Sequence, residues 1–456
     1  MVNTVIKNCK VVQPHGIFRQ GIAIDKGKII AIGYDDYLPP AKLVVDAKGN
    51  YVIPGLVDPH FHLMGSVLGL DPAQEIRNET EACAYGGVST IINMLRQTGD
   101  LPRIAKDFVT LYEENGFVDL ALTVSLWQLA DVKHIRTLAH LGVAGFKLLT
   151  HYRLAAATAG LPGLDDGIIY SAFEEIGKLV SQGYKIFARA HCENSEIFLA
   201  FKSRMLEEKI TPHHWHETRP NFVEAEAMRR YIYLAHHAGC PFYIVHVSIK
   251  EGLDIITRAR GERISVIAET CPQYLVLNSD NCDGILAKVQ PPIRTTEDNE
   301  ALWQGIREGV INCVGTDHAA ARLNHKGESI WNAGLGFDGI AHWLQIMLSE
   351  GVNKGRISLE KLVEVCCYNP AHIHGLTPKK GLIAVGSDAD LVIVDLDKEV
   401  VAGPNPPYTG TDFNVYEGWK FKGCAVLTIV RGKVVMQEGK VVGTPGFGRY
   451  NPAHTR

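Results

Sequence analysis

The middle of the chain alternates between short apolar runs and longer segments in which apolar residues recur every three to four positions. Short runs predict β-strands, and recurrence at this spacing predicts amphipathic helices. The apolar runs lie at 53–57, 88–93, 118–124, 143–148, 185–190, 242–245, 264–268 and 311–314. Segments with helical spacing follow most of them, for example at 170–182, 223–237, 300–308 and 338–350.

Two α/β folds are built from such an alternation. Eight strands that alternate with helices over about 300 residues predict a (β/α)8 TIM barrel, somewhat above the typical ~250 residues. A doubly wound open sheet is the competing fold, but no glycine-rich dinucleotide-binding turn follows the first run. We therefore expect the barrel.

Both ends of the chain show a different pattern. Short strands separated by turn signals fill the N-terminal stretch and recur near the C-terminus, with no helix of useful length in the N-terminal stretch. This pattern predicts one small β-sandwich built from both termini. The expected domains are residues 1–52 (first part of the sandwich), 53–375 (the catalytic barrel with a binuclear metal site) and 376–456 (second part of the sandwich and the tail).

Composition narrows the class of protein. Hydrophobic residues make up 46% and charged residues 21% of the chain, as in ordinary soluble globular proteins. A net charge of −4 and the lack of a basic cluster give no reason to expect nucleic acid or membrane as a partner. The first 25 residues do not resemble a signal peptide. Ten scattered cysteines without C-x-x-C pairs predict a reduced, cytoplasmic protein.

The first barrel strand ends in a candidate metal-binding pair. His60 and His62 are two residues apart, and alternate side chains of a strand point to the same side, so both imidazoles aim at one point. Imidazole suits zinc, copper, iron or nickel. With 19 histidines in 456 residues, about one His-x-His pair is expected by chance. Two further pairs, 214/216 and 372/374, do not follow apolar strands and are interpreted as surface or capping histidines.

Four other strand ends add candidates. The fourth, fifth, sixth and eighth strands run into Lys147, His191, His246 and Asp317, and chemistry in such a barrel lies at the C-terminal ends of the strands. Each residue alone has a structural alternative, such as a hydrogen-bonded histidine, a solvent-exposed lysine or a helix-capping aspartate. Together at one rim, without a metal, they would leave several buried polar groups unpaired.

Lys147 is the unusual member, because an ammonium group repels metals. A buried lysine can lose its proton, and the neutral amine can combine with carbon dioxide to form a carbamate that bridges two cations. Six ligands around two metals leave room for a shared water, whose pKa falls towards about 7. Asp317 is placed to accept the proton of this water and pass it on.

Ordered motifs over essentially the whole chain resemble the amidohydrolase superfamily, in particular its hydantoinase/dihydropyrimidinase branch. The motifs are 54–62 (PGLVDPHFH), 146–147 (FK) with Tyr152 five residues on, 191–194 (HCEN), 245–248 (VHVS), 269–275 (ETCPQYL), 291–294 (PPIR), 316–318 (TDH), 369–371 (NPA), 381–391 (GLIAVGSDADL) and 416–418 (YEG). Each is modest alone, and together in this order they are highly specific.

The resemblance implies a set of roles. Two divalent ions, zinc foremost and manganese as the alternative, would be bridged by Lys147 carboxylated by CO2. His60, His62 and Asp317 would hold the more buried ion, and His191 and His246 the other. Tyr152 would donate its hydroxyl to the developing oxyanion, its alternative being an aromatic residue that packs at the rim.

The resemblance also implies how the ring is held. Backbone groups at Gln290 and Asn332 would bind the ring amide, although the family usually has serine in place of Gln290. Leu63 and Met64 follow His62 where dihydroorotases carry an arginine for the substrate carboxylate, so dihydroorotase activity is not expected. Loops over residues 64–70, 95–99 and 153–167 would line the pocket for the ring substituent. Their residues Met64, Leu68, Leu95 and Leu154 would favour an apolar substituent.

The expected activity is the opening of a cyclic amide, a hydantoin or dihydropyrimidine ring, by a metal-bridging hydroxide. Allantoin or another cyclic ureide or imide is the nearest alternative substrate. A non-catalytic dihydropyrimidinase-related assembly protein is a rival of another class, but such relatives lack the metal ligands that are all present here. A deaminase of the superfamily is a second enzymatic alternative. Deaminases mostly use one metal without a bridging lysine, so Lys147 distinguishes the two. The family forms tetramers, so a homotetramer is expected.

Overall fold

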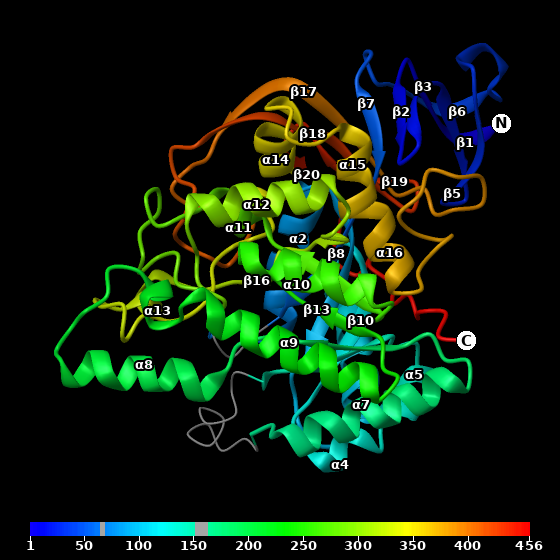
Figure 1. Cartoon of the computed structure of the whole chain (residues 1–456). Helices are drawn as coiled ribbons and strands as arrows, with labels where there is room; N and C mark the ends of the chain where they lie inside the picture. Colours follow the sequence, from blue (N-terminus) through cyan, green and yellow to red (C-terminus); the bar gives the residue numbers. More distant parts are fainter. Residues whose placement is uncertain (64–68, 151–162) are drawn as a thin grey trace.

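The computed structural model of the chain describes residues 1–63, 69–150 and 163–456, and its central feature is a sheet of parallel strands (Figure 1). Neighbouring strands follow the order β15-β14-β13-β12-β11-β10-β9-β8-β16. The strands are β8 (Leu56–His62), β9 (Val88–Leu95), β10 (Asp119–Leu126), β11 (Gly145–Leu148), β12 (Phe187–Ala190), β13 (Phe242–Ile244), β14 (Val266–Thr270), β15 (Cys313–Val314) and β16 (His318–Ala319).

The sheet closes into a barrel because its two end strands are consecutive in the chain. Only three residues separate β15 from β16. β15 pairs with β14, Cys313 opposite Glu269, whereas β16 pairs with β8, His318 opposite Phe61. The eighth strand is thus broken in the middle, and its two halves join opposite neighbours. The predicted (β/α)8 barrel is confirmed.

Helices surround the barrel and alternate with its strands. They are α2 (Pro72–Tyr85), α3 (Leu101–Asn115), α4 (Leu129–Val132), α5 (Ile135–His140), α7 (Asp166–Ser181), α8 (Ser195–Glu207), α9 (Asn221–His237), α10 (Lys250–Gly261), α11 (Pro272–Val276), α12 (Thr296–Arg307), α13 (Leu323–Lys326), α14 (Trp343–Ile346), α15 (Leu359–Val363) and α16 (Asn369–Ile373). α7 shows the local logic: Asp165 caps its N-terminus by accepting from Ile168 N, and its apolar residues, among them Ile169 and Phe173, face the core.

One predicted helix differs in extent. The helical spacing over 338–350 yields α14 only from Trp343, followed by the π-helical segment η4 (Met347–Asn353). Asp338 instead lies in irregular backbone before the helix, where its carboxylate accepts from Ile340 N and Ala341 N and contacts His318. These contacts hold the start of the segment out of the helix.

Strands from both termini form the predicted sandwich, which lies beside the barrel in Figure 1. One sheet has the order β5-β4-β1-β6 and the other β20-β19-β18-β17-β7-β2-β3. Their bounds are β1 (Val2–Lys7), β2 (Lys10–Gln13), β3 (Gly16–Arg19), β4 (Gly21–Asp25), β5 (Lys28–Gly33), β6 (Ala41–Asp46), β7 (Tyr51–Pro54), β17 (Leu391–Val401), β18 (Lys420–Val430), β19 (Lys433–Gln437) and β20 (Lys440–Val441). A separate apolar cluster that includes Ile6, Ile24, Leu391 and Ile429 fills the space between them.

The first apolar run, expected as one strand over 53–57, is divided at Gly55. β7 pairs with β17 in the sandwich, whereas β8 pairs with β9 in the barrel. A Cβ at Gly55 would lie 2.4 Å from Ser89 Oγ, so only glycine fits this junction. The domain limits at 52/53 and 375/376 stay a prediction.

Lys380 ties the two domains together. Its buried ammonium lies 2.5 Å from Asp119, at the start of β10, and 2.7 Å from Asp390 and 2.9 Å from Asp388. The charges of these carboxylates raise the pKa of Lys380 against the opposing effect of burial. This acidic cluster is therefore compensated within the fold.

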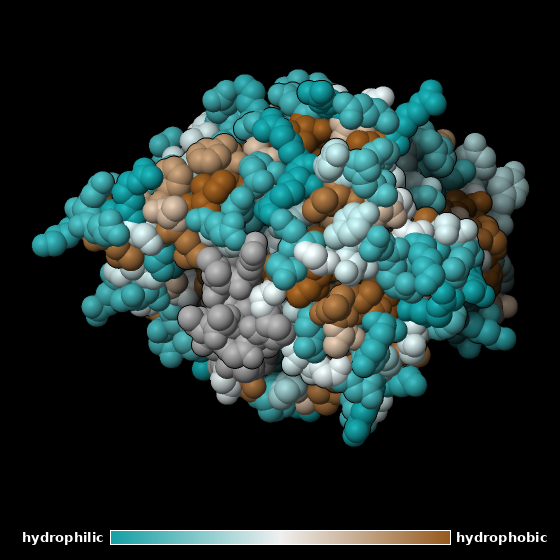
Figure 2. Space-filling model, turned by 60° about the horizontal axis from the view of Figure 1, so that its bottom comes forward, coloured by the Kyte–Doolittle hydropathy of each residue, from teal (hydrophilic) through white to brown (hydrophobic). Residues whose placement is uncertain are grey.

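Within the described residues, no helix has the length and apolar character needed to cross a membrane. On the face shown in Figure 2, hydrophobic residues form several patches separated by hydrophilic ones.

Candidate metal centre

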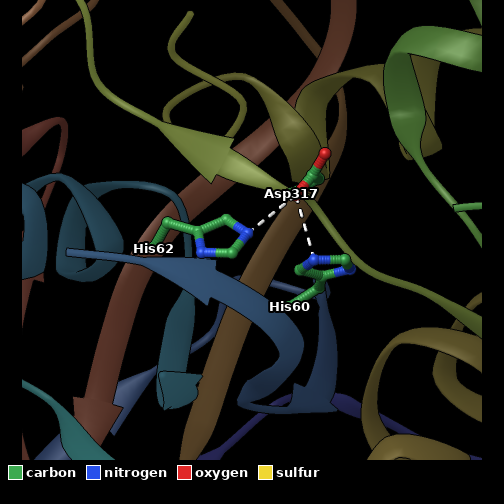
Figure 3. Close-up of side chains that lie close together, drawn as sticks. All are labelled: His60, His62 and Asp317. Atoms are coloured by element: carbon green, nitrogen blue, oxygen red, sulfur yellow. Dashed lines mark hydrogen bonds and ion pairs between the residues drawn. The ribbon is translucent and has the colours of Figure 1, made fainter. Parts of the chain in front are cut away.

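The histidine pair and Asp317 meet at the end of the barrel strands. Figure 3 shows the two imidazoles of β8 reaching towards the Asp317 carboxylate, which comes from the break between β15 and β16. Asp317 Oδ1 lies 3.0 Å from His60 Nε2 and 3.1 Å from His62 Nε2. The three potential ligand atoms all lie within 4.8 Å of one another.

The other three candidates line the same pocket. Lys147 lies in β11, His191 directly after β12 and His246 shortly after β13, and all six candidates border one cavity. The ring centroid of His246 lies 5.4 Å from that of His60 and 4.6 Å from that of His191. The structure therefore brings the six predicted residues together at one rim, as the barrel topology requires.

The Lys147 side chain is almost completely buried, with 1% of its surface exposed. Burial, aided by the Arg189 guanidinium, lowers the pKa of Lys147 to about 7 although Asp317 and Glu269 act in the opposite direction. A substantial fraction of neutral amine is therefore present at neutral pH. This is the form that reacts with carbon dioxide.

Burial also favours the neutral form of three of the candidate histidines. It lowers the pKa of His62 to about 3 and lowers that of His191, and it holds the pKa of His246 well below its usual value. For Asp317, burial alone would raise the pKa, but the contacts with His60 and His62 lower it well below its usual range. The rim thus offers neutral imidazoles and a carboxylate, the protonation states that metals bind.

Glu269, at the end of β14, orients two of the candidates. Its Oε1 lies 2.6 Å from His60 Nδ1 and accepts from His246 N at 3.2 Å. Its Oε2 accepts from Arg189 at 3.1 Å and from the Tyr243 hydroxyl at 2.6 Å. Burial acts to raise the pKa of Glu269, but His60 and Arg189 lower it to about 2. A carboxylate opposite Nδ1 fixes the tautomer and leaves Nε2 of His60 for the pocket.

Glu193 orients His191 in the same way. Its Oε2 lies 2.6 Å from His191 Nε2 and accepts from Arg219 at 2.8 Å. Although burial would raise the pKa of Glu193, Arg219 and His191 lower it to about 2. This carboxylate fixes the orientation of the His191 ring, the kind of support that metal-bound histidines usually have.

Asp58 holds the segment that carries Asp317. Its Oδ1 accepts from His60 N and Thr316 N, each at 3.0 Å, and its Oδ2 accepts from the Thr316 hydroxyl at 2.5 Å. Burial raises the pKa of Asp58 to about 6. Asp58, Glu193 and Glu269 have no predicted role, although they lie in the motifs at 54–62, 191–194 and 269–275.

The donor set fits divalent transition metals. In the described part of the chain, the buried nitrogens His62 Nδ1 and His246 Nδ1 have no hydrogen-bond partner, and His60 Nε2 meets only the Asp317 contact. Neutral imidazoles, a carboxylate and an amine that can become a carbamate are ligands typical of zinc and its neighbours. The carboxylates behind His60 and His191 match the usual support of metal-bound histidines.

The remaining predicted site residues have different positions. Gln290 lines the pocket together with Leu335 and Gly336. Asn332 lies on the same loop as those two residues but is exposed. Tyr152 and Met64, like Leu68 and Leu154, lie outside the described residues, and nothing tests their roles.

The predicted apolar lining is not found near strand β9. Leu95, expected to face the ring substituent, is 2% exposed and packs in the main hydrophobic core. The next residue, Arg96, lines the pocket instead. Because side chains of a strand alternate between its two faces, the residue beside Leu95 is the one that faces the pocket.

The additional histidine pairs are structural. His214 and His216 stack at 5.9 Å, and His214 caps the short helix η3 (Trp215–Thr218) through Glu217. His374 was expected at the surface or at a cap. It is the C-cap residue of α16, as the second alternative states, and it is buried, with Nδ1 2.9 Å from Pro370 O and Nε2 3.3 Å from Arg189.

Known proteins resemble this chain over nearly its full length. An L-hydantoinase from Paenarthrobacter aurescens is 33% identical over 99% of this chain and 98% of its own. A D-hydantoinase from Ralstonia pickettii is 32% identical over 98% of both chains. An allantoinase from Escherichia coli is 33% identical over 94% of both chains.

Solved structures share the fold. A D-hydantoinase structure matches with a TM-score of 0.92 at 31% identity, over 100% of this chain and 99% of the other. A dihydropyrimidinase from Brevibacillus agri matches with a TM-score of 0.90 at 28% identity, over 99% of each chain. Residues 184–435, more than half of the chain, match the amidohydrolase family. With the barrel, the sandwich and the six converging residues, these matches show that the chain belongs to the amidohydrolase superfamily, in its hydantoinase branch.

Proposed function

We propose that this protein is a metal-dependent hydrolase that opens the ring of a cyclic amide, a hydantoin or a dihydropyrimidine. The observation that carries the proposal is the convergence of Lys147, four histidines and Asp317 on one pocket in a chain related throughout to hydantoinases. Allantoin is the second candidate ring, because allantoinases are related to this chain at the same level of identity.

We propose that the six pocket residues hold two divalent ions, with zinc foremost and manganese as the alternative. Lys147 would bridge them after carboxylation by CO2. The ions would supply a hydroxide nucleophile at neutral pH and withdraw electron density from the ring carbonyl. The partly neutral amine and the carboxylates behind His60 and His191 support this assignment.

Asp317 is proposed as the proton carrier. Its Oδ1 faces both His60 and His62, and its low pKa keeps it ionised until a proton is released in the pocket. It would take the proton of the attacking water and deliver it to the ring nitrogen as the C–N bond breaks. Tyr152 would donate to the oxyanion that forms on the carbonyl.

The pocket walls would hold the ring. Gln290 borders the cavity, and the loop that carries Asn332 contributes Leu335 and Gly336 to it. Backbone groups of these two loops would bind the ring amide, as the family resemblance implies. We further propose a homotetramer in the cytoplasm. Light scattering on the purified protein measures the oligomeric state, and the free state of all ten cysteines agrees with a reducing compartment.

Metal analysis combined with turnover tests the proposal. The purified protein is assayed with hydantoin, both hands of a 5-substituted hydantoin, dihydrouracil, allantoin and dihydroorotate, before and after chelation and after return of zinc or manganese. We expect about two ions per chain and ring opening that chelation abolishes and metal restores. A protein that carries its metals and opens none of these rings would contradict the proposal, and so would turnover that survives complete chelation.

A further inference from the structure

The pocket is closed on one side by two loops that touch each other. Val289 and Gln290 come from the first loop, and Leu335 and Gly336 from the second. A backbone hydrogen bond of 3.1 Å joins them, from Gly336 N to the carbonyl of Lys288. The shape of this wall therefore depends on how the second loop is held.

Two buried lysines donate hydrogen bonds to consecutive backbone carbonyls of the second loop. Lys288 Nζ donates to Ala333 O at 2.8 Å, and Lys326 Nζ donates to Gly334 O at 3.2 Å. Lys288 is 5% exposed and Lys326 1%. The Lys288 ammonium also lies over the Trp215 ring, 4.1 Å from its centroid.

These lysines are unusual because they lack acidic partners. In the part of the chain that the structure describes, neither ammonium lies within ion-pair distance of a carboxylate, and each donates a hydrogen bond to the loop backbone. Burial and the charge of Lys288 lower the pKa of Lys326 to about 7, whereas burial and the charges of Lys202 and Arg219 lower that of Lys288 to about 8. Burying two amines in this way costs free energy that surface lysines avoid.

The backbone of the second loop has little freedom to adjust if the two lysines are lost. Gly334 N donates to His325 O at 2.7 Å, and a Cβ on Gly334 would lie 2.6 Å from that oxygen. Gly336 has a φ of +92°, and a Cβ there would lie 2.8 Å from Ala319 O, itself in a residue that lines the pocket. The loop thus passes close to other backbone at both glycines, and the lysines fix the peptide planes in between.

We propose that Lys288 and Lys326 are positioning residues for substrate binding, which set the loop over 332–336 as the wall that holds the ring. The inference rests on the proposed function, because it assigns this loop to the substrate of that same pocket. Neither lysine borders the metal centre, so their loss leaves the six candidate ligands in place. Their effect falls on binding of the ring rather than on the chemical step.

Lys288→Met and Lys326→Met test the proposal, because methionine keeps the length of the apolar stem and removes the donor. Lys202→Met is the matched control: its ammonium lies 6.0 Å from the Trp331 ring in the same neighbourhood but donates to no loop carbonyl. We expect KM to rise about tenfold or more in both test variants, the effect of losing roughly 1.4 kcal/mol of binding. We expect kcat to change less than KM, metal content to stay at the wild-type level, and the control to match wild type. Unchanged KM in both variants would overturn the proposal.

Hydrogen exchange provides a readout that needs no substrate. Amides 332–336 should exchange faster in both methionine variants than in wild type, while amides of β14 keep their rates. Equal exchange at 332–336 in all proteins would overturn the positioning role. If neither variant folds, hydrogen exchange of the wild-type protein tests the proposal. Its amides at 332–336 are then expected to exchange more slowly than those of the loop at 403–411, and equal rates would refute the proposal. Failure of the wild type to open any ring would instead refute the proposed function, leaving the exchange result to judge the loop.

Discussion

Replacement of Glu269 by glutamine is the sharpest test of how the metal centre is supported. Four donors converge on this carboxylate: His60 Nδ1 and His246 N on Oε1, Arg189 and the Tyr243 hydroxyl on Oε2. Glutamine has the same shape, but one of its two terminal groups is an NH2 donor. In either orientation, two of the four contacts therefore become donor–donor contacts.

The size of the effect follows from these contacts. Removing one partner of a buried ion pair costs about 3–5 kcal/mol, so we expect Glu269→Gln to lower the free energy of unfolding by about 3 kcal/mol. Since Glu269 orients His60 through its ring and His246 through its backbone, metal affinity should also fall, by about 10–100-fold. That loss corresponds to about 1.4–2.7 kcal/mol of binding free energy.

Competition titration against a chromophoric chelator measures the metal affinity, and urea denaturation of the metal-free protein measures the stability. Glu224→Gln is the matched control. Glu224 is nearly as buried as Glu269, and it lies 3.1 Å from Arg294, as Glu269 lies from Arg189, but it contacts none of the six candidates. Wild-type metal affinity in Glu269→Gln would refute the reasoning. An equal loss of affinity in Glu224→Gln would refute it too, since the effect would then be general destabilisation.

Three further predictions follow from single contacts. Lys147→Ala should bind less metal, measured by elemental analysis, and lose more than about 100-fold in ring-opening rate; full metal content with full activity would exclude the bridging role. Gly177→Ala should destabilise the protein by about 1–3 kcal/mol, because its Cβ would lie 1.9 Å from Ala238 O, whereas Gly261→Ala, with open space around it, should not destabilise. Because the pKa of Lys326 is lowered to about 7 in the fold from 10.5, the unfolded chain binds more protons between these values, and stability should rise with pH across that window by up to about 1.4 kcal/mol per pH unit. Urea denaturation at pH 7.5 and 9.5 should show a larger rise in wild type than in Lys326→Met, in which only the lowered pKa values of Lys147 and Lys288 still contribute. An equal rise in the two proteins would contradict the prediction.

The sequence predicts those parts of the fold that depend on local patterns of apolar and polar residues. Apolar runs indicated all eight barrel strands, and the residues at the strand ends indicated the six candidate ligands, which all border the pocket. The break between strands at Gly55 could not be predicted, because the apolar run continues through it. Only the pairing of β7 with the sandwich and of β8 with the barrel shows that this run contributes to two sheets. Leu95 was assigned to the pocket for a similar reason, since the side of β9 that faces the pocket depends on the register of the sheet.

The supporting residues could not be inferred from spacing. Glu269 and Arg189 are 80 positions apart, and Asp58 and its partner Thr316 are 258 positions apart. A glutamate after a strand has many possible partners until the barrel closes, so its role as an orienter of His60 becomes visible only in three dimensions. Lys288 and Lys326 carry even less signal, because lysine is ordinarily a surface residue.

Two of the six candidates adopt a backbone conformation that most residues avoid. His246 has a φ of 43° and Asp317 a φ of 51°, and histidine and aspartate are among the side chains that tolerate this left-handed region best. Such conformations cost of order 1–3 kcal/mol each and persist where the surroundings hold them. Here the buried carboxylates do so, since Glu269 accepts from His246 N, and Asp58 accepts from Thr316 N just before Asp317. The same acids that fix the imidazole of His60 and its backbone therefore also fix the chain at the opposite side of the pocket. The metal centre and its strained backbone are thus held by one set of contacts, which explains why a single buried carboxylate should influence ligands on different strands.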